Sequence, residues 1–124
     1  MASPRPRVHL IWIGDRLPWF ARLAIESAIV AMPTSTVTLH SVVAHPDGRH
    51  VRALERFEQF ERRSWPLRSV FEHCPGGPDP WLDVLERTNG TPAAVGNLVR
   101  LALLDRFGGV YLDTDTIVVA PLDD

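Results

Sequence analysis

The sequence predicts an α/β fold with a parallel sheet, and three features of its pattern support this prediction. Short apolar runs rich in β-branched and aromatic residues alternate with longer stretches that have helical apolar spacing. Glycine and proline separate these segments, and the last helical stretch is followed by a strand that ends in acidic residues. Alternating strands and helices build a parallel sheet whose ligands bind beyond the carboxyl ends of the strands.

The first half of the chain is predicted to contain two strands and two helices. Residues 8–13 form a buried strand that is ended by a glycine. Helical spacing of apolar residues predicts a helix over residues 19–32, and a proline ends it. Residues 34–44 are β-branched and predict the second strand. Residues 49–63 have the spacing of an amphipathic helix whose charges point outward.

The second half is predicted to continue the alternation. A third strand is expected over residues 67–71 and a short helix over residues 81–87. A long helix over residues 93–107 begins with a threonine N-cap and a proline, and two glycines end it. Residues 110–115 then predict a strand that ends in acid, and residues 116–120 predict a last strand at an apolar edge of the sheet.

Composition is that of an ordinary globular protein of one domain. The chain has 124 residues, of which 45% are hydrophobic and 23% charged, which is enough to bury a core. Its 13 basic residues are all arginine, and with 15 acidic residues they give a net charge of -2. This balance provides no electrostatic footprint for nucleic acid, so no nucleic-acid partner is expected.

The N-terminal residues and the cysteine content give further expectations. The Pro- and Arg-rich residues 1–7 predict a disordered segment, and residues 8–124 predict a single domain. Cys74 is the single cysteine, so an intrachain disulfide is impossible and a cytoplasmic location is expected. The apolar run over residues 8–13 is too short for a signal peptide or a membrane span, and neither is expected.

Asp113 and Asp115 are the main candidates for chemistry. At positions i and i+2 of an extended strand, their carboxylates lie on one face and can converge on one ligand. Carboxylate oxygens suit Mg2+ or Mn2+, which keep positions open for phosphate oxygens and water. Such a cation neutralises the charge on a departing diphosphate. The alternative is an Asp-x-Asp sequence that arises by chance, because Asp is common in turns.

The sequence around these aspartates resembles a known family. Residues 92–115, with the Pro121-Leu122 pair and the opening residues 9–14, are similar to the glycosyltransferase sugar-binding region that contains a DXD motif. That family includes bacterial and fungal sugar transferases and is similar to the catalytic domains of clostridial glucosylating toxins. The resemblance implies a Rossmann-like GT-A fold for nucleotide-diphospho-sugar transfer, of which this chain has the N-terminal nucleotide-binding half.

The resemblance also implies an activity and its cofactors. We expect a retaining glycosyltransferase that takes a nucleotide sugar, with a UDP-sugar favoured over a GDP-sugar, and uses Mn2+ or Mg2+. Asp115 would ligate the metal, and Asp113 would hold ribose or sugar hydroxyls and reach the metal through water. Arg100 would contact the donor sugar or the diphosphate. Asn97, one helical turn earlier, stands where relatives often carry Asp, so it keeps hydrogen bonding without the charge.

Two aromatic residues complete the site that the resemblance implies. Trp12 would stack on the uracil base, and Tyr111 would lie near the nucleotide. Without the family, each is equally an ordinary aromatic residue of a strand, and Trp12 is more often part of a core. Arg100 in an apolar helix needs an anionic partner if it is buried, which Asp113, Asp115 or a phosphate could supply. Otherwise it lies on an exposed helix face.

Other functions compete with glycosyl transfer. Residues 112–117 also resemble the first motif of haloacid-dehalogenase-type phosphatases, whose further catalytic groups would have to follow, and only nine residues follow Asp115. A second alternative is a nucleotide-sugar-binding module without catalysis, or a fragment truncated after the DXD motif. The acceptor can be a glycan, a protein or a small molecule, and the apolar edge predicts a homo-oligomer.

Overall fold

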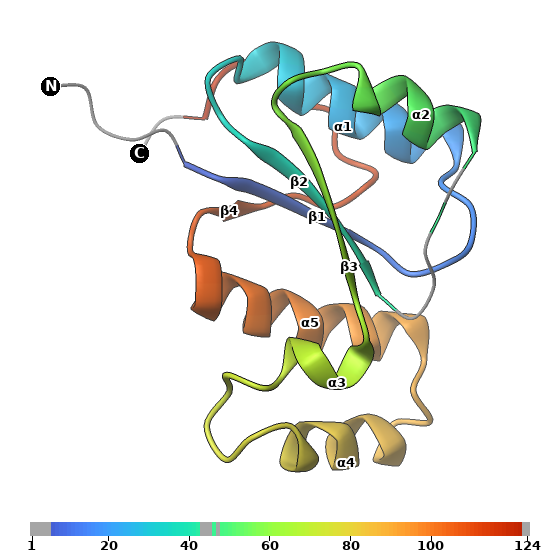
Figure 1. Cartoon of the computed structure of the whole chain (residues 1–124), viewed down its shortest axis with the longest axis vertical. Helices are drawn as coiled ribbons and strands as arrows, with labels where there is room; N and C mark the ends of the chain where they lie inside the picture. Colours follow the sequence, from blue (N-terminus) through green and yellow to red (C-terminus); the bar gives the residue numbers. More distant parts are fainter. Residues whose placement is uncertain (1–5, 43–45, 47, 123–124) are drawn as a thin grey trace, which may run out of the picture.

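The structure is a computed structural model that describes residues 6–42, 46 and 48–122. Four strands form one sheet, and helices cover both of its faces (Figure 1). The α/β class with a parallel sheet is confirmed, and it is consistent with part of a Rossmann-like GT-A fold. In chain order, the elements are β1 (Val8–Trp12), α1 (Trp19–Ala31), β2 (Val37–Val42), α2 (Arg49–Glu55), β3 (Phe60–Trp65), α3 (Leu67–Val70), α4 (Asp79–Arg87), α5 (Pro92–Phe107) and β4 (Val110–Tyr111).

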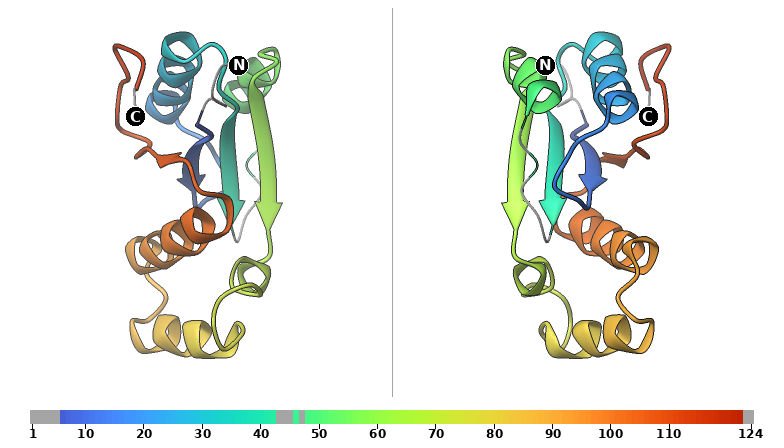
Figure 2. Two further views of the ribbon diagram at one scale, coloured as in Figure 1. Left: turned by 90° about the vertical axis from the view of Figure 1, so that its left-hand side faces the viewer. Right: turned by 90° about the vertical axis from the view of Figure 1, so that its right-hand side faces the viewer.

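The sheet has the strand order β3-β2-β1-β4, and each neighbouring pair is parallel. Alternate residues of β1 face opposite ways: Val8 and Leu10 join the core beneath α1 and α2, whereas Ile11 joins the core beneath α5. Figure 2 shows α5 lying between the sheet and α4. Burial on both faces explains why β1 and β2 are almost continuously apolar in the sequence.

The helix α5 follows the predicted pattern closely. Thr91 accepts a hydrogen bond at its hydroxyl from the Ala94 amide at 3.2 Å, and Pro92 occupies the first turn. Val95 and Val99 are buried against the sheet and its neighbours. Gly108 ends the helix with a positive φ of 65°. No helix in the described residues is long and apolar enough to cross a membrane.

Two predictions in the middle of the chain are wrong. The helix expected over residues 49–63 ends at Glu55, and β3 follows within the same stretch. The strand expected over residues 67–71 is instead the short helix α3. Of the charged residues that suggested an exposed helix face, those within residues 60–65 belong to an edge strand, which pairs with β2 along its whole length. Pairing with β2 therefore overrides the local helical spacing.

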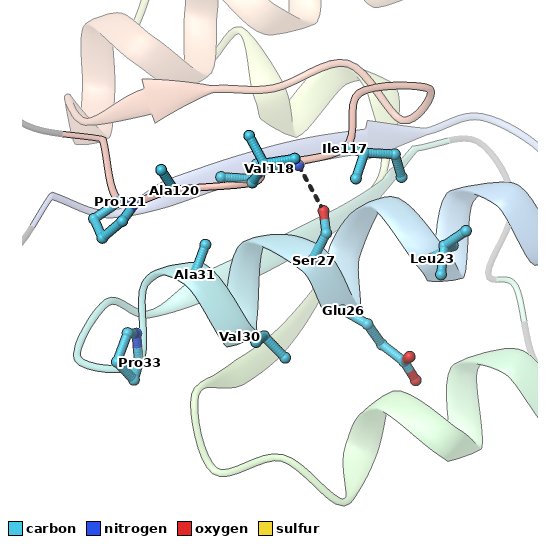
Figure 3. Close-up of a pocket in the computed structure, with 11 residues that line it drawn as sticks. Leu23, Glu26, Ser27, Val30, Ala31, Pro33, Ile117, Val118, Ala120 and Pro121 are labelled. Carbon is cyan, nitrogen blue, oxygen red and sulfur yellow. Dashed lines mark hydrogen bonds between the residues drawn. The ribbon is translucent and has the colours of Figure 1, made fainter.

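The end of the chain also differs from the prediction. Of residues 110–115, only Val110 and Tyr111 are in a strand, and no strand forms over residues 116–120. Residues 117–121 lie along α1 instead, where the Val118 amide donates to the Ser27 hydroxyl at 2.9 Å (Figure 3). Parts of two predicted segments, residues 1–5 and 43–44, lie outside the described residues.

Candidate functional site

A small cavity opens where β1 ends, between the first turns of α5 and the segment after β4. Its volume is about 250 Å3. The residues that line it are Ile11, Trp12, Ile13, Pro92, Gly96, Tyr111 and Thr114. It therefore brings together Trp12, Tyr111 and the middle residue of the Asp-Thr-Asp sequence, as expected for the carboxyl edge of a parallel sheet.

Trp12 is fixed by its neighbours on the α1 side of the sheet. Its indole Nε1 donates to the Arg16 carbonyl at 2.8 Å, and its ring meets Phe20 edge-on at 6.2 Å between centroids. Gly14 allows the backbone to turn so that the Arg16 carbonyl reaches the Trp12 indole. Its φ is +154°, and a Cβ there would lie 3.1 Å from the indole Nε1. Trp12 is half-buried, so it serves the core and still lines the cavity.

Tyr111 links the helix to the acidic segment. The Arg100 guanidinium lies over its ring, 5.3 Å from the centroid. Burial raises the pKa of the Tyr111 phenol above its ordinary value, and the Asp113 carboxylate raises it further through its charge and as a hydrogen-bond acceptor. The phenol therefore stays protonated at neutral pH, next to a carboxylate and a guanidinium.

Asp113 and Asp115 are exposed and lie in a turn rather than on a strand. The Thr116 amide donates to the Asp113 carbonyl at 3.0 Å and closes this turn. Placement of both carboxylates on one face of an extended strand is therefore wrong. The turn still leaves both aspartates exposed to solvent, on either side of Thr114, which lines the cavity.

The carboxylates at this turn fit a cation that is held jointly by the protein and a bound diphosphate better than one that is coordinated by the protein alone. The described residues contain no group of three or more His, Cys, Asp or Glu that could hold a metal ion. Mg2+ is typically held by one or two carboxylates, and phosphate oxygens and water complete its shell. Asp113 and Asp115 could supply the protein's share of such a shell, so the residues fit a divalent cation on a diphosphate.

The two predicted polar residues of α5 differ in their surroundings. Arg100 is half-buried and lies on Tyr111, whereas Asn97 is exposed. No salt bridge joins Arg100 to Asp113 or Asp115, all three of which the structure describes. The guanidinium thus keeps its donors for an anionic ligand.

A larger groove lies elsewhere, between α1 and residues 117–121, with a volume of about 790 Å3 (Figure 3). Its lining is mainly apolar, with Glu26 as its one charged residue. Val30 and Val119 are exposed there, at 73% and 91%. A groove of this character does not suit a diphosphate, whose charge needs donors or a cation.

Sequence reasoning did not find the hydrogen-bonded chain beneath α5. His9 and His40 have no metal-ligand spacing in the sequence, which indicates only surface or core residues, but their rings bond to each other at 2.9 Å and both are buried. Alternation along two buried strands could have indicated that both histidines face the same side. Their pairing across strands depends on register, which the sequence alone does not specify.

Comparison with known proteins gives two findings. The family model described as "Glycosyltransferase sugar-binding region containing DXD motif" matches residues 22–124. "Glucan organizing enzyme 1" of Cryptococcus neoformans var. grubii is 25% identical over 127 aligned positions, which cover 90% of this chain. The aligned region is 26% of that relative's length, so this chain spans about a quarter of it.

Proposed function

Because the chain belongs to the family of glycosyltransferase sugar-binding regions that contain a DXD motif, we propose that it binds a nucleotide sugar together with Mn2+ or Mg2+. Asp115 ligates the cation, and Asp113 holds donor hydroxyls and reaches the cation through water. Arg100 meets the diphosphate or the sugar, Trp12 stacks on the base, and Tyr111 lies beside the nucleotide. A UDP-sugar is the favoured donor, and Asn97 can add a hydrogen bond from the rim.

The single observation that supports this proposal most is the cavity at the carboxyl edge of the sheet. It places Trp12, Tyr111 and Thr114 around one space, next to two exposed carboxylates and a half-buried guanidinium. An aromatic face, a cation site and a guanidinium are what a base, a diphosphate and a sugar each require. These residues come from β1, α5, β4 and the segment after β4, and their convergence at one edge of the sheet supports the proposal.

The parent activity that we propose is glycosyl transfer with retention of configuration. A bound divalent cation would neutralise the charge that develops on the departing diphosphate. The residues of this chain would orient the donor, and Arg100 would stabilise the same charge through hydrogen bonds. A retaining reaction requires no dedicated general base from the protein.

The cavity is small compared with typical ligand pockets. Its 250 Å3 fall below the roughly 300–1,000 Å3 of typical ligand pockets. We therefore propose that the isolated chain binds donor but transfers little sugar, because transfer also needs the acceptor held in near-attack geometry. The acceptor would be a glycan, a protein or a small molecule. Self-association through the apolar groove beside α1 is part of the same proposal.

Calorimetric titration with UDP, GDP and their sugars, with and without Mn2+, tests the proposal. We expect UDP binding that requires Mn2+, because the diphosphate and the carboxylates repel each other without a cation. Asp115→Asn should weaken the Mn2+-dependent binding at least about tenfold. Asp83→Asn on α4 is the matched control, since Asp83 is also exposed but lies on another element. Unchanged Mn2+-dependent binding in Asp115→Asn, with the fold intact, would contradict the proposal that Asp115 ligates the cation.

A nucleotide-sugar-binding module without turnover is the second candidate. The small volume of the cavity favours it. Release of free sugar from UDP-sugars separates the two functions. Donor binding without any sugar release supports the module, whereas slow Mn2+-dependent hydrolysis that is lost in Asp115→Asn supports the enzyme.

A further inference from the structure

A chain of hydrogen bonds crosses the sheet on the face covered by α5. The Trp65 indole Nε1 on β3 donates to Nδ1 of His40 on β2 at 3.0 Å. Nε2 of His40 lies 2.9 Å from Nδ1 of His9 on β1, and Nε2 of His9 lies 3.0 Å from the carbonyl oxygen of Gly108. The chain therefore runs from the edge strand β3 to the turn that precedes β4.

The two ends of this chain fix every proton in it. An indole N–H can only donate, so Nδ1 of His40 accepts and its Nε2 carries the proton. A carbonyl can only accept, so Nε2 of His9 carries a proton and its Nδ1 accepts from His40. Both histidines are thus neutral Nε2–H tautomers, and all polar ring atoms of both are satisfied.

The surroundings keep this arrangement dry and neutral. The Phe107 ring stacks on both histidines, with centroid distances of 6.0 Å to His9 and 6.2 Å to His40. Each histidine is only 1% exposed. Burial lowers the pKa of both, and the charges of Arg63 on β3 and, for His9, Arg7 lower it further. Glu61 on β3 acts in the opposite direction on His9, and Arg106 of α5 lies over Phe107.

The chain of hydrogen bonds ends at the turn that precedes β4, and backbone pairing alone fixes this turn only weakly. β4 pairs with β1 only at Val110 and Tyr111. The Val110 amide donates to the Arg7 carbonyl at 2.8 Å, and the Leu112 amide donates to the His9 carbonyl at 2.9 Å. His9 therefore supports this segment twice, through its backbone carbonyl and through its side chain on Gly108. The cavity residues Tyr111 and Thr114 follow directly.

We propose that His9 and His40 are positioning residues that hold the Gly108–Gly109 turn and, through it, the Asp113–Asp115 segment in place for ligand binding. Trp65 and His40 fix the tautomer of His9, and His9 fixes the Gly108 carbonyl. For its effect on binding, this inference rests on the function proposed above. The effect on the turn itself is independent of that function.

Nitrogen-15 NMR of the histidine rings in the native protein tests the chain directly. At neutral pH both His9 and His40 should show a protonated Nε2 and an unprotonated Nδ1. A protonated Nδ1 on either ring would overturn the proposal, because the chain could not then run from Trp65 to Gly108. This measurement needs no variant, so it holds even if a substitution prevents folding.

Two substitutions of His9 test the positioning role. His9→Phe keeps a flat ring against Phe107 but removes the donor to Gly108. His9→Gln places its amide nitrogen at the same number of bonds from Cβ as Nε2, so it can still donate. Val42→Ala is the matched control, because the Val42 side chain is buried in the core beneath α5 and has no group that could join the chain of hydrogen bonds.

Amide hydrogen exchange and calorimetry then provide two separate readouts. In His9→Phe, exchange at Val110 and Leu112 should rise at least about tenfold relative to amides of β2. The affinity of His9→Phe for UDP with Mn2+ should fall about tenfold. His9→Gln should recover most of the exchange protection and most of the affinity, and Val42→Ala should change neither the relative exchange rate nor the affinity.

Each outcome decides the proposal. Unchanged relative exchange in His9→Phe overturns it, and so does faster exchange with unchanged affinity. If the native protein itself does not bind UDP with Mn2+, the proposed function fails. The exchange ratio then still shows whether the histidines hold the turn.

Discussion

The two sides of β1 differ in how the sheet is held together. Toward β2 and β3, the strands pair at five and six successive positions. Toward β4, pairing stops after two positions, although the segment that follows carries the candidate cation ligands. Extended pairing makes the first region robust, whereas the second depends on single side-chain and backbone contacts.

This difference places the candidate site at the weakly paired end of the sheet. β4 and its turn are held in register by the close approach of Gly109 to Arg7, by the His9 bond to Gly108, and by the Val110 and Leu112 amides, which donate to the carbonyls of Arg7 and His9. A ligand that bridges the Asp113–Asp115 turn and α5 would add the contacts that the short strand lacks. Binding should therefore stabilise this region more than the rest of the sheet.

Replacing Gly109 with alanine should break the weak side most severely. Gly109 has a φ of +89°, and a Cβ there would lie 2.3 Å from the Arg7 carbonyl oxygen. We expect a loss of about 3 kcal/mol in the free energy of unfolding, because left-handed strain adds to the displacement of β4. Urea unfolding followed by circular dichroism measures this loss.

Gly90→Ala is the control for backbone strain alone. Gly90 has a φ of +57°, and a Cβ there would meet nothing within 4 Å. Its replacement should cost about 1 kcal/mol. Equal losses for the two variants would show that the approach of Gly109 to Arg7 contributes nothing.

Lowering the pH should have the next largest effect, because it protonates the histidines of the hydrogen-bond chain. Burial, the charge of His9 and the charge of Arg63 lower the pKa of His40 to about 3. In the unfolded chain His40 titrates near its ordinary 6.5, so the unfolded state binds more protons between these values. Stability is therefore complete above pH 6.5 and falls as the pH drops toward 3.

Urea unfolding at pH 7 and pH 5 measures this dependence. His40 alone should account for a loss of about 2 kcal/mol over that interval. Burial raises the pKa of Glu61, but hydrogen bonds from Arg63 and Thr38 outweigh burial and hold this pKa below its ordinary value. Glu61 in the folded protein therefore stays ionised between pH 5 and pH 7. Because burial also lowers the pKa of His9, His9 adds to the loss in the same direction, so His40→Gln should reduce the pH dependence and leave a smaller slope from His9. The same slope in that variant would contradict the assignment to His40.

Trp12→Phe should have a smaller effect, and on binding rather than on stability. Loss of stacking area should weaken UDP binding by about 1 kcal/mol, or about fivefold. The fluorescence quench on UDP binding should also disappear. Trp81→Phe is the matched control, because the Trp81 indole likewise donates to a backbone carbonyl but lies on α4. A quench that persists in Trp12→Phe and is lost in Trp81→Phe would contradict stacking on Trp12.

Val119→Asp should have the smallest effect on folding. Val119 is 91% exposed beside α1, so the free energy of unfolding should change by less than about 0.5 kcal/mol. The charge should still reduce self-association through the apolar groove, which light scattering over a range of concentrations measures. Val84→Asp on α4 is the control. If both variants associate as the native protein does, the groove is not the contact.

The sequence predicted the strongly patterned elements well. β1, α1 and α5 form within a few residues of the predicted ranges, because their apolar spacing, proline and glycine positions act locally. The region around β3 could not be predicted in the same way. Residues 60–65 are charged and carry helical spacing, and only pairing with β2 makes them a strand.

The candidate site shows the same division. The family resemblance implied Trp12 and Tyr111 as site residues, and both line one cavity. Asp113 and Asp115 were expected on a strand, but pairing with β1 ends at Tyr111 and a turn follows. The histidine chain was missed, because it depends on which residues of β1, β2 and β3 lie diagonally across from each other.

Paramagnetic broadening of backbone amide signals by Mn2+ in the presence of UDP tests the proposed cation site most directly. If Asp113 and Asp115 hold the cation, the amide signals of residues 113–116 should broaden first and those of Tyr111 next. Signals of α4, with its own exposed acidic residues, should remain sharp. Broadening centred on α4, or no broadening at Thr114 at saturating UDP, would contradict a cation site at the Asp-Thr-Asp turn.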